Sequence, residues 1–118
     1  MNTERVYAMR FSQIYSLLVN KVERKGRSRQ ELDQIITCLT GYDAQAIEGL
    51  SHSDTDYLSF FQNAPAMNPQ YVRVTGSICG VRVEKIEDEW MRKIRCLDKL
   101  VDELARGKSV EKILRILC

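Results

Sequence analysis

The sequence predicts an all-α protein, a compact single-domain bundle of five to seven helices spanning residues 1–118. Apolar side chains recur at three- and four-residue spacing along most of the chain. Capping residues and glycines stand at the ends of these segments. The length, with 44% hydrophobic and 29% charged residues, is typical of one globular domain that needs no disulfide or metal to hold it together.

Two adjacent helices are predicted in the N-terminal third, over residues 12–25 and 29–40. In the first, the apolar residues of "FSQIYSLLVNKVERKG" share one face, and Ser12 is a suitable N-cap. The second begins after Ser28, which Glu31 follows three residues later in the pattern of a capping box. A glycine comes directly after each segment, as expected where a helix ends.

Two short helices are predicted next. "DAQAIEGL" follows Asp43, whose carboxylate is a good N-cap. The second lies in "SHSDTDYLSFFQNAP", where Asp54 or Ser53 is the expected cap. Pro65 disfavours the helical conformation of the residue before it, so this helix should end by Asn63.

Residues 71–83 allow two interpretations. Asn68 as N-cap and Pro69 at the first helical position favour a helix that continues through this range, and we prefer it. Gly76 and Gly80 would then share a face that another backbone approaches closely. The alternative is a β-hairpin that turns at "TGS", because valines alternate with polar residues on both sides.

The longest helix is predicted in "EWMRKIRCLDKLVDELARG", with Asp88 as its N-cap and Gly107 as its stop. Its apolar stripe is wider than a coiled-coil seam, so we interpret it as a central core helix rather than a dimer zipper. Ser109 is expected to cap a final short helix, "VEKILRIL".

Charge is distributed in blocks although the net charge is only +2. Residues 1–30 are basic, residues 31–70 contain six acids and no Lys or Arg, and residues 71–118 are mixed. Such blocks complement each other within a fold or mark faces that meet a partner. One alternative function is therefore nucleic-acid or regulatory binding through the basic segment 21–29, which contains Lys21, Arg24, Lys25, Arg27 and Arg29. We rank it below other binding because no aromatic residues stand among these cations and the helices that follow are acidic.

Cysteine and histidine usage indicates neither a metal site nor a cofactor. The four cysteines form no CxxC pair, and His52 is the single histidine, so zinc-ligand spacing is missing. We interpret Cys38, Cys79, Cys96 and Cys118 as reduced thiols of a cytoplasmic protein, since the N-terminus has no signal-peptide pattern. A third possibility for function is a small enzyme that uses Cys79, activated by the nearby Arg82.

Several runs together resemble a known family. They are "ERKGRSRQELDQIITCLTGYD", "APAMNP", "VTGSICGVRVEKIED" and "IRCLDKLVDELARGKSVEKIL". The chain is similar, from about Val6 to Leu114, to small bacterial proteins designated only as a domain of unknown function, number two thousand two hundred. The resemblance implies a cytosolic, mostly helical, single-domain protein and supplies neither an activity nor catalytic residues.

The leading hypothesis is a cytosolic binding or interaction module without catalytic activity. Its partner would be a protein or a small molecule, with a homodimer as an open alternative and with no membrane association. Polar residues beside turns are the candidate ligand-binding residues, namely Tyr42, Asp43, Asn68, Thr75, Cys79 and Arg82. The competing interpretation, which we rank higher, is that they are helix caps and turn hydrogen bonds.

Overall fold

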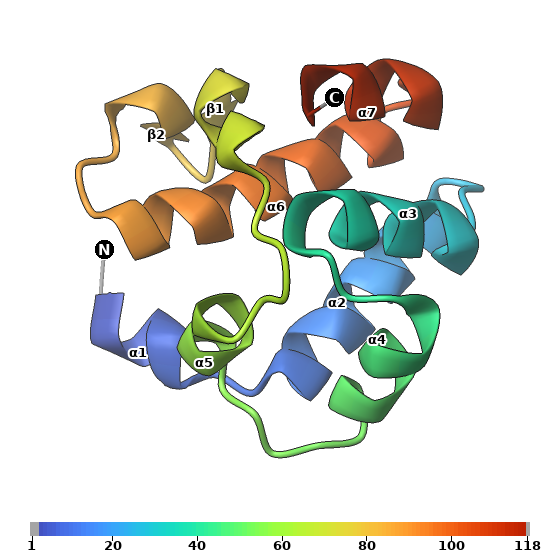
Figure 1. Ribbon diagram of the computed structural model, residues 1–118. Coiled ribbons are helices and arrows are strands. Elements are labelled where there is room, and N and C mark those ends of the chain that lie inside the picture. The colour runs from blue at the N-terminus through green and yellow to red at the C-terminus, as the bar shows by residue number, and fades with distance from the viewer. Residues whose placement is uncertain (1–2, 118) are drawn as a thin grey trace.

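Seven α-helices and one short β-hairpin form the computed structural model, which describes residues 3–117 (Figure 1). The helices are α1 (Thr3–Ala8), α2 (Phe11–Arg24), α3 (Arg29–Thr40), α4 (Ala44–Leu50), α5 (Tyr57–Gln62), α6 (Glu89–Ala105) and α7 (Val110–Leu117). The remaining elements are the 3₁₀ helices η1 (Pro69–Arg73) and η2 (Val83–Lys85) and the strands β1 (Ser77–Ile78) and β2 (Val81–Arg82). The predicted all-α class is confirmed. Within residues 3–117, no helix is both long and apolar enough to cross a membrane.

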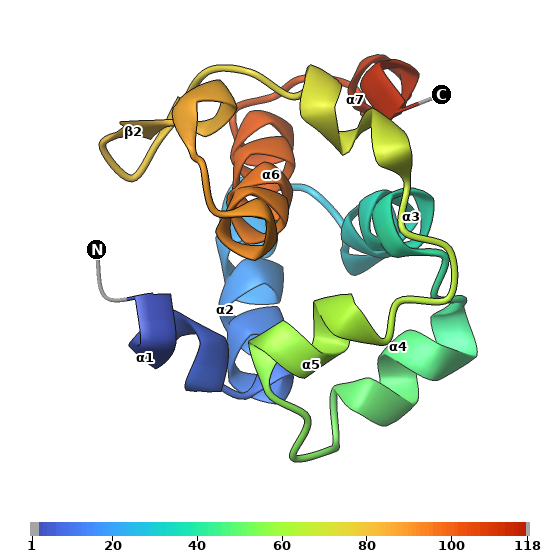
Figure 2. The same cartoon turned by 60° about the vertical axis from the view of Figure 1, so that its left-hand side comes forward.

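Helix α6 is the centre of the molecule. It contacts α2, α3, α5, α7, strand β1 and η2, and the two ribbon views show these elements arranged around it (Figures 1 and 2). Ile94, Leu97, Val101 and Leu104 are fully buried, as expected from their spacing. The apolar stripe therefore packs within the chain, in agreement with the predicted core helix.

Aromatic side chains join the start of α2 to α5, and this contact moves two predicted helix boundaries. The rings of Phe11 and Phe60 stack with their centroids 4.0 Å apart. The Phe11 N–H donates to the carbonyl of Thr55 at 2.9 Å, so α2 begins at Phe11 and the predicted cap Ser12 lies inside it. Asp56, rather than Asp54 or Ser53, caps α5, because its carboxylate accepts from the Ser59 N–H.

The other predicted caps are confirmed. Ser28 and Glu31 form the complete capping box of α3. Asp43 caps α4, and Asp88 caps α6 by accepting from two backbone N–H groups. Asn68 caps η1, which is a single short 3₁₀ segment and not the long helix expected there. Helix α1 was not predicted, because its few residues show no clear apolar face.

The preferred helix over residues 71–83 is wrong, and the hairpin alternative is correct. Ser77 pairs with Arg82 and Ile78 with Val81. Gly76, Cys79 and Gly80 have φ values of 111°, 52° and 79°, which an α-helix cannot contain. The turn is at Cys79 and Gly80 rather than at "TGS", since two consecutive positive φ values are typical of a type I′ hairpin turn.

The expected close backbone packing at the glycine pair is also wrong. A Cβ on Gly76 would meet the side chain of Lys99 at 2.8 Å, whereas a Cβ on Gly80 would meet nothing within 4 Å. The two glycines therefore serve the backbone conformation of the hairpin. Cys79 and Cys96 are free thiols, and Cys118 lies outside the described residues.

Candidate functional site

A groove of about 600 Å³ lies between α3, α4 and α7. Figure 2 shows these three helices one below another along the same side of the molecule. The apolar part of the groove is lined by Cys38, Ala44, Val110 and Leu114. Gln30, Gln34 and Thr37 supply polar groups from α3. A partly apolar concave surface with a few polar groups is typical of a binding site.

The sequence explains why α3 has a second usable face. Leu32, Ile35, Ile36 and Leu39 are fully buried and point into the core. Thr37 and Cys38 follow directly in the helix and turn toward α4 and α7 instead. On α7, Val110 and Leu114 are four residues apart, so they lie one turn apart on one face and stay partly exposed.

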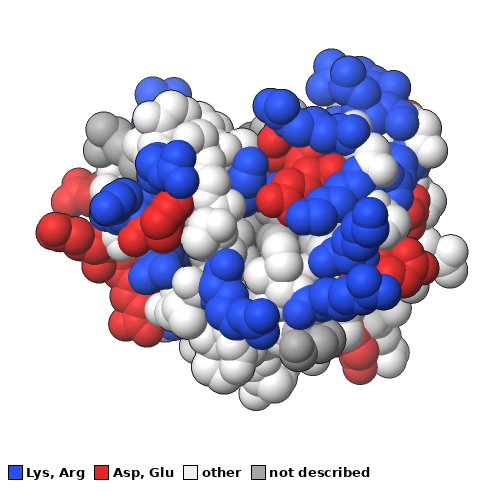
Figure 3. Space-filling model, turned by 90° about the horizontal axis from the view of Figure 1, so that it is seen from above, with Lys and Arg blue, Asp and Glu red and all other residues white. Residues whose placement is uncertain are grey.

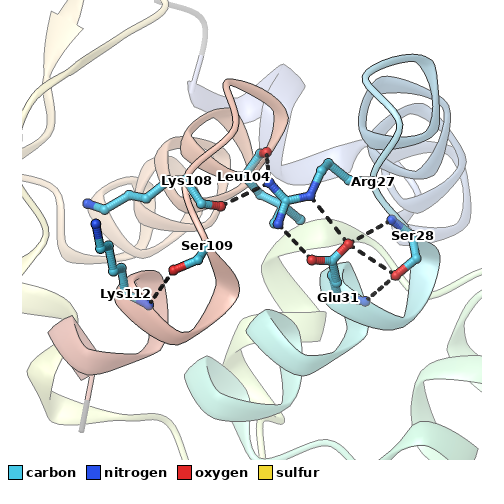
Figure 4. Close-up of polar contacts among 7 residues, drawn as sticks. All are labelled: Arg27, Ser28, Glu31, Leu104, Lys108, Ser109 and Lys112. Atoms are coloured by element: carbon cyan, nitrogen blue, oxygen red, sulfur yellow. Dashed lines mark hydrogen bonds and ion pairs between the residues drawn. The ribbon is translucent and has the colours of Figure 1, made fainter.

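One end of the groove is fixed by Arg27, in the loop between α2 and α3 (Figure 4). Its Nη1 donates to the carbonyls of Leu104 and Lys108 at 3.2 and 3.0 Å. Its Nη2 donates to Glu31 of α3 at 2.7 Å. These bonds tie the end of α6 and the loop before α7 to the start of α3, and we call this set the Arg27 clamp.

The Arg27 clamp also shifts the acidity of its carboxylate. The hydrogen bond from Arg27 and then the one from the Ser28 N–H lower the pKa of Glu31 to about 2. Glu31 is therefore ionised at neutral pH, and the Arg27 side chain is only 18% exposed. Partial burial of this kind strengthens charged hydrogen bonds.

The other end of the groove is fixed by Asn68, in the loop before η1. Its Nδ2 donates to the carbonyl of Cys38 at 3.2 Å and to that of Leu117 at 2.9 Å. Its Oδ1 accepts from the Gln70 N–H, and its own N–H donates to the carbonyl of Leu39. Asn68 thus joins the last turn of α3 to the last turn of α7, so both ends of this helix pair are fixed.

The charged residues that line the groove are acidic. Asp33 and Glu111 line it, and the lining residues include neither Lys nor Arg. Asp33 belongs to the acidic block of residues 31–70, and Glu111 lies in the first turn of α7. Asp33 accepts from the Tyr15 hydroxyl at 2.6 Å and lies 3.9 Å from Nε of Arg29, so the exposed Glu111 is the groove carboxylate that favours a positively charged group on a ligand.

The six residues predicted to bind a ligand fall into two groups. Tyr42 is buried and donates to the carbonyl of Phe60, whereas Asp43 and Asn68 cap helices beside the groove. The second group belongs to the hairpin region, where Thr75, Cys79 and Arg82 are exposed. The role of all six residues in ligand binding stays a prediction. Asp43 directly precedes the groove residue Ala44, and Asn68 donates to the carbonyl of the groove residue Cys38. The hairpin group lies against α6.

Cys79 stands at the hairpin turn. Its Sγ lies 3.9 Å from Nη1 of Arg95, and Arg82 pairs instead with Glu84. The hairpin is at the top of Figure 1, and the loop between α4 and α5, which contains His52, is at the bottom. The expected activation of Cys79 by Arg82 therefore lacks a contact between the two, and enzymatic use of Cys79 stays a prediction.

The basic segment 21–29 is largely engaged in contacts within the chain. Lys21 pairs with Asp102, Arg27 forms its clamp, and Arg29 pairs with Glu48. Arg24 and Lys25 are exposed. In the view of Figure 3, acidic side chains lie between many of the basic ones, so the two signs of charge alternate over that face. These pairs reduce the charge available to phosphate groups, and nucleic-acid binding stays a prediction.

A second concave site was not predicted from the sequence. Arg29, Glu48 and His52 come together with Tyr15 around a cavity of about 300 Å³. Only the contact between Glu48 and His52 could have been predicted, because these residues are four positions apart at the end of a helix. The approach of Tyr15 and Arg29 depends on how α2 and α3 pack, which no local pattern reveals.

Comparison with known proteins identifies relatives of the whole chain. A family model described as "Uncharacterized protein conserved in bacteria (DUF2200)" matches residues 5–115. The crystal structure of uncharacterized protein SP1917 is similar, with a TM-score of 0.91 and 41% sequence identity. That match covers 98% of this chain and 94% of the other. No curated protein matches the chain.

Proposed function

We propose that this chain, which belongs to the DUF2200 family of proteins conserved in bacteria, is a non-catalytic interaction module. Its groove between α3, α4 and α7 binds a basic amphipathic helix of a partner protein. The observation behind the proposal is a groove that is apolar along its floor, acidic at its charged positions and fixed at both ends.

The lining of the groove favours this occupant. A helix presents apolar side chains at positions i, i+3, i+4 and i+7, which match a groove between helices. Val110, Leu114 and Cys38 supply the apolar contacts, and the exposed Glu111 supplies a partner for Lys or Arg on the flank of the helix. Because the Arg27 clamp and Asn68 hold α7 against α3, little ordering is needed on binding.

A cytosolic location is part of the proposal. Cys79 is an exposed free thiol, and Cys38 lines the groove. Free thiols of this kind persist in a reducing compartment. Oxidation of Cys38 would add polar atoms to the apolar floor of the groove and would therefore weaken binding.

The test uses two designed peptides of equal length and equal apolar pattern. One has Lys and the other Glu at the flanking positions, and fluorescence anisotropy measures binding to the full chain. We expect the Lys peptide to bind with a Kd of about 10 μM and the Glu peptide to bind at least about tenfold more weakly. Equal binding of the two peptides, or binding of neither, contradicts the proposal.

A matched pair of variants assigns the binding to the groove. Leu114→Lys places a charge in the groove, whereas Leu17→Lys makes the same change at a residue of α2 that is 59% exposed. We expect only Leu114→Lys to abolish binding of the Lys peptide. Equal effects of both variants would contradict the site. Sedimentation of the chain alone tests the other occupant, because a dimer lost in Leu114→Lys would assign the groove to a second copy.

A further inference from the structure

The cavity of about 300 Å³ between α2, α3 and α4 is separate from the groove and is lined by polar side chains. Ser12, Tyr15 and Ser16 line it from α2, and Arg29 lines it from the first position of α3. Glu48 of α4 and His52 close the other side. Hydroxyl, guanidinium, carboxylate and imidazole groups thus face one small space.

Arg29 and Glu48, which carry opposite charges, meet at this cavity. Asp33 lies behind them, where its carboxylate accepts from the Tyr15 hydroxyl at 2.6 Å and is 3.9 Å from Nε of Arg29. Nη2 of Arg29 pairs with Glu48, and Nε of Arg29 donates to the Tyr15 hydroxyl at 2.7 Å. His52 Nε2 lies 3.0 Å from the other oxygen of Glu48. Hydrogen bonds with His52 and then Arg29 lower the pKa of Glu48, so its carboxylate is ionised at neutral pH.

The pairing of Arg29 with Glu48 is easily exchanged. Their side chains are 47% and 53% exposed, and an exposed ion pair contributes only about 0–1 kcal/mol. Glu48 lies on a helix of seven residues and has no buried surroundings that would fix its side chain. A ligand that offers a partner to each of the two charges would replace one ion pair by two.

We propose that this cavity binds a small zwitterion of the α-amino acid class. Its carboxylate pairs with Arg29, and its ammonium group pairs with Glu48. A simple anion would separate Glu48 from Arg29 without giving it a new cation, and a simple cation would leave Arg29 with Asp33 alone, 3.9 Å from its Nε. A zwitterion supplies a new partner to both charges. The volume is at the lower limit of ligand sites and suits a small molecule.

The test is a titration of the full chain, followed by the amide and imidazole NMR signals, with three related probes. L-Alanine carries both charges, propionate carries only the carboxylate, and ethylamine carries only the ammonium group. We expect saturable shifts at Ser12, Ser16 and His52 with L-alanine and a Kd of about 1 mM. Propionate and ethylamine should bind at least about tenfold more weakly.

Variants separate the two halves of the site. Glu48→Gln should weaken L-alanine and leave propionate unchanged or tighter, whereas Arg29→Gln should abolish the response to both. Arg24→Gln removes an exposed charge that does not line this cavity and should change nothing. The proposal is overturned if the L-alanine shifts stay linear up to about 50 mM. It is equally overturned if either single-charge probe binds as tightly as L-alanine.

Discussion

The helix pair α3–α7 and the hairpin of β1 and β2 both pack against α6, yet different forces hold them. The helix pair combines fully buried side chains, such as Ile36 and Ile113, with the Arg27 clamp and Asn68. The hairpin has only two residues in each strand and three positive φ values at Gly76, Cys79 and Gly80. Side-chain burial therefore maintains one region, and backbone conformation maintains the other.

The two regions should differ most in the stability lost when a buried side chain is shortened in each. Ile36→Ala deletes a fully buried side chain and should destabilise the chain by about 2–5 kcal/mol. Ile78→Ala, at a half-buried strand residue, should cost about 1 kcal/mol. Urea unfolding followed by the fluorescence of Trp90 measures both. Equal losses would show that burial holds the hairpin as strongly as the helix pair.

The Arg27 clamp should have the next largest effect. Arg27→Ala leaves the carbonyls of Leu104 and Lys108 and the carboxylate of Glu31 without this donor, so we expect a loss of about 2 kcal/mol. Hydrogen exchange should speed up in the first turn of α7 before it does so in α6. Arg24→Ala, at an exposed residue of α2, is the control and should stay within about 0.5 kcal/mol of the parent chain.

The stability of the hairpin should depend instead on how well the turn residues accept a positive φ. Cys79 has a φ of 52°, where most side chains are strained, and Gly80 follows with a φ of 79°. Cys79→Asn creates Asn-Gly, the preferred pair of a type I′ turn, and should stabilise the chain by about 0.5–1 kcal/mol. Gly80→Ala should destabilise it by a similar amount. If both variants unfold at the same urea concentration as the parent chain, backbone strain does not govern this turn.

A further effect should be a pH dependence confined to the helix pair. The pKa of Glu31 falls from an ordinary 4.5 to about 2 in the folded chain. Its contribution to stability is therefore complete above pH 4.5 and is lost as the pH falls toward 2. Glu31→Gln keeps a capping-box side chain but removes the charge. Its free energy of unfolding should therefore be lower than that of the parent chain at neutral pH and should approach it in acid. A constant difference at every pH would contradict this assignment.

The sequence anticipated most of the helical frame and part of the candidate sites. The caps Ser28, Asp43 and Asp88 were found because a capping hydrogen bond joins residues two or three positions apart. The sequence singled out Arg27 as a possible nucleic-acid contact and Asn68 as a cap or ligand residue, but it did not reveal the contacts by which they fix the groove. The backbone carbonyls that their side chains reach, in Cys38, Leu104, Lys108 and Leu117, lie from 30 to 81 residues away in the chain, beyond any local pattern.

Local periodicity and capping thus determined the all-α class, the central position of α6 and the two helices that face each other across the groove. Tertiary structure decided the start of α2 at Phe11, the hairpin at Cys79 and Gly80, and the meeting of Arg29 with Glu48. The physical reason is the range of the interactions. A helix is encoded by neighbours within one turn, whereas a turn that competes with a helix, or a cavity between helices, depends on contacts that form only when the core packs.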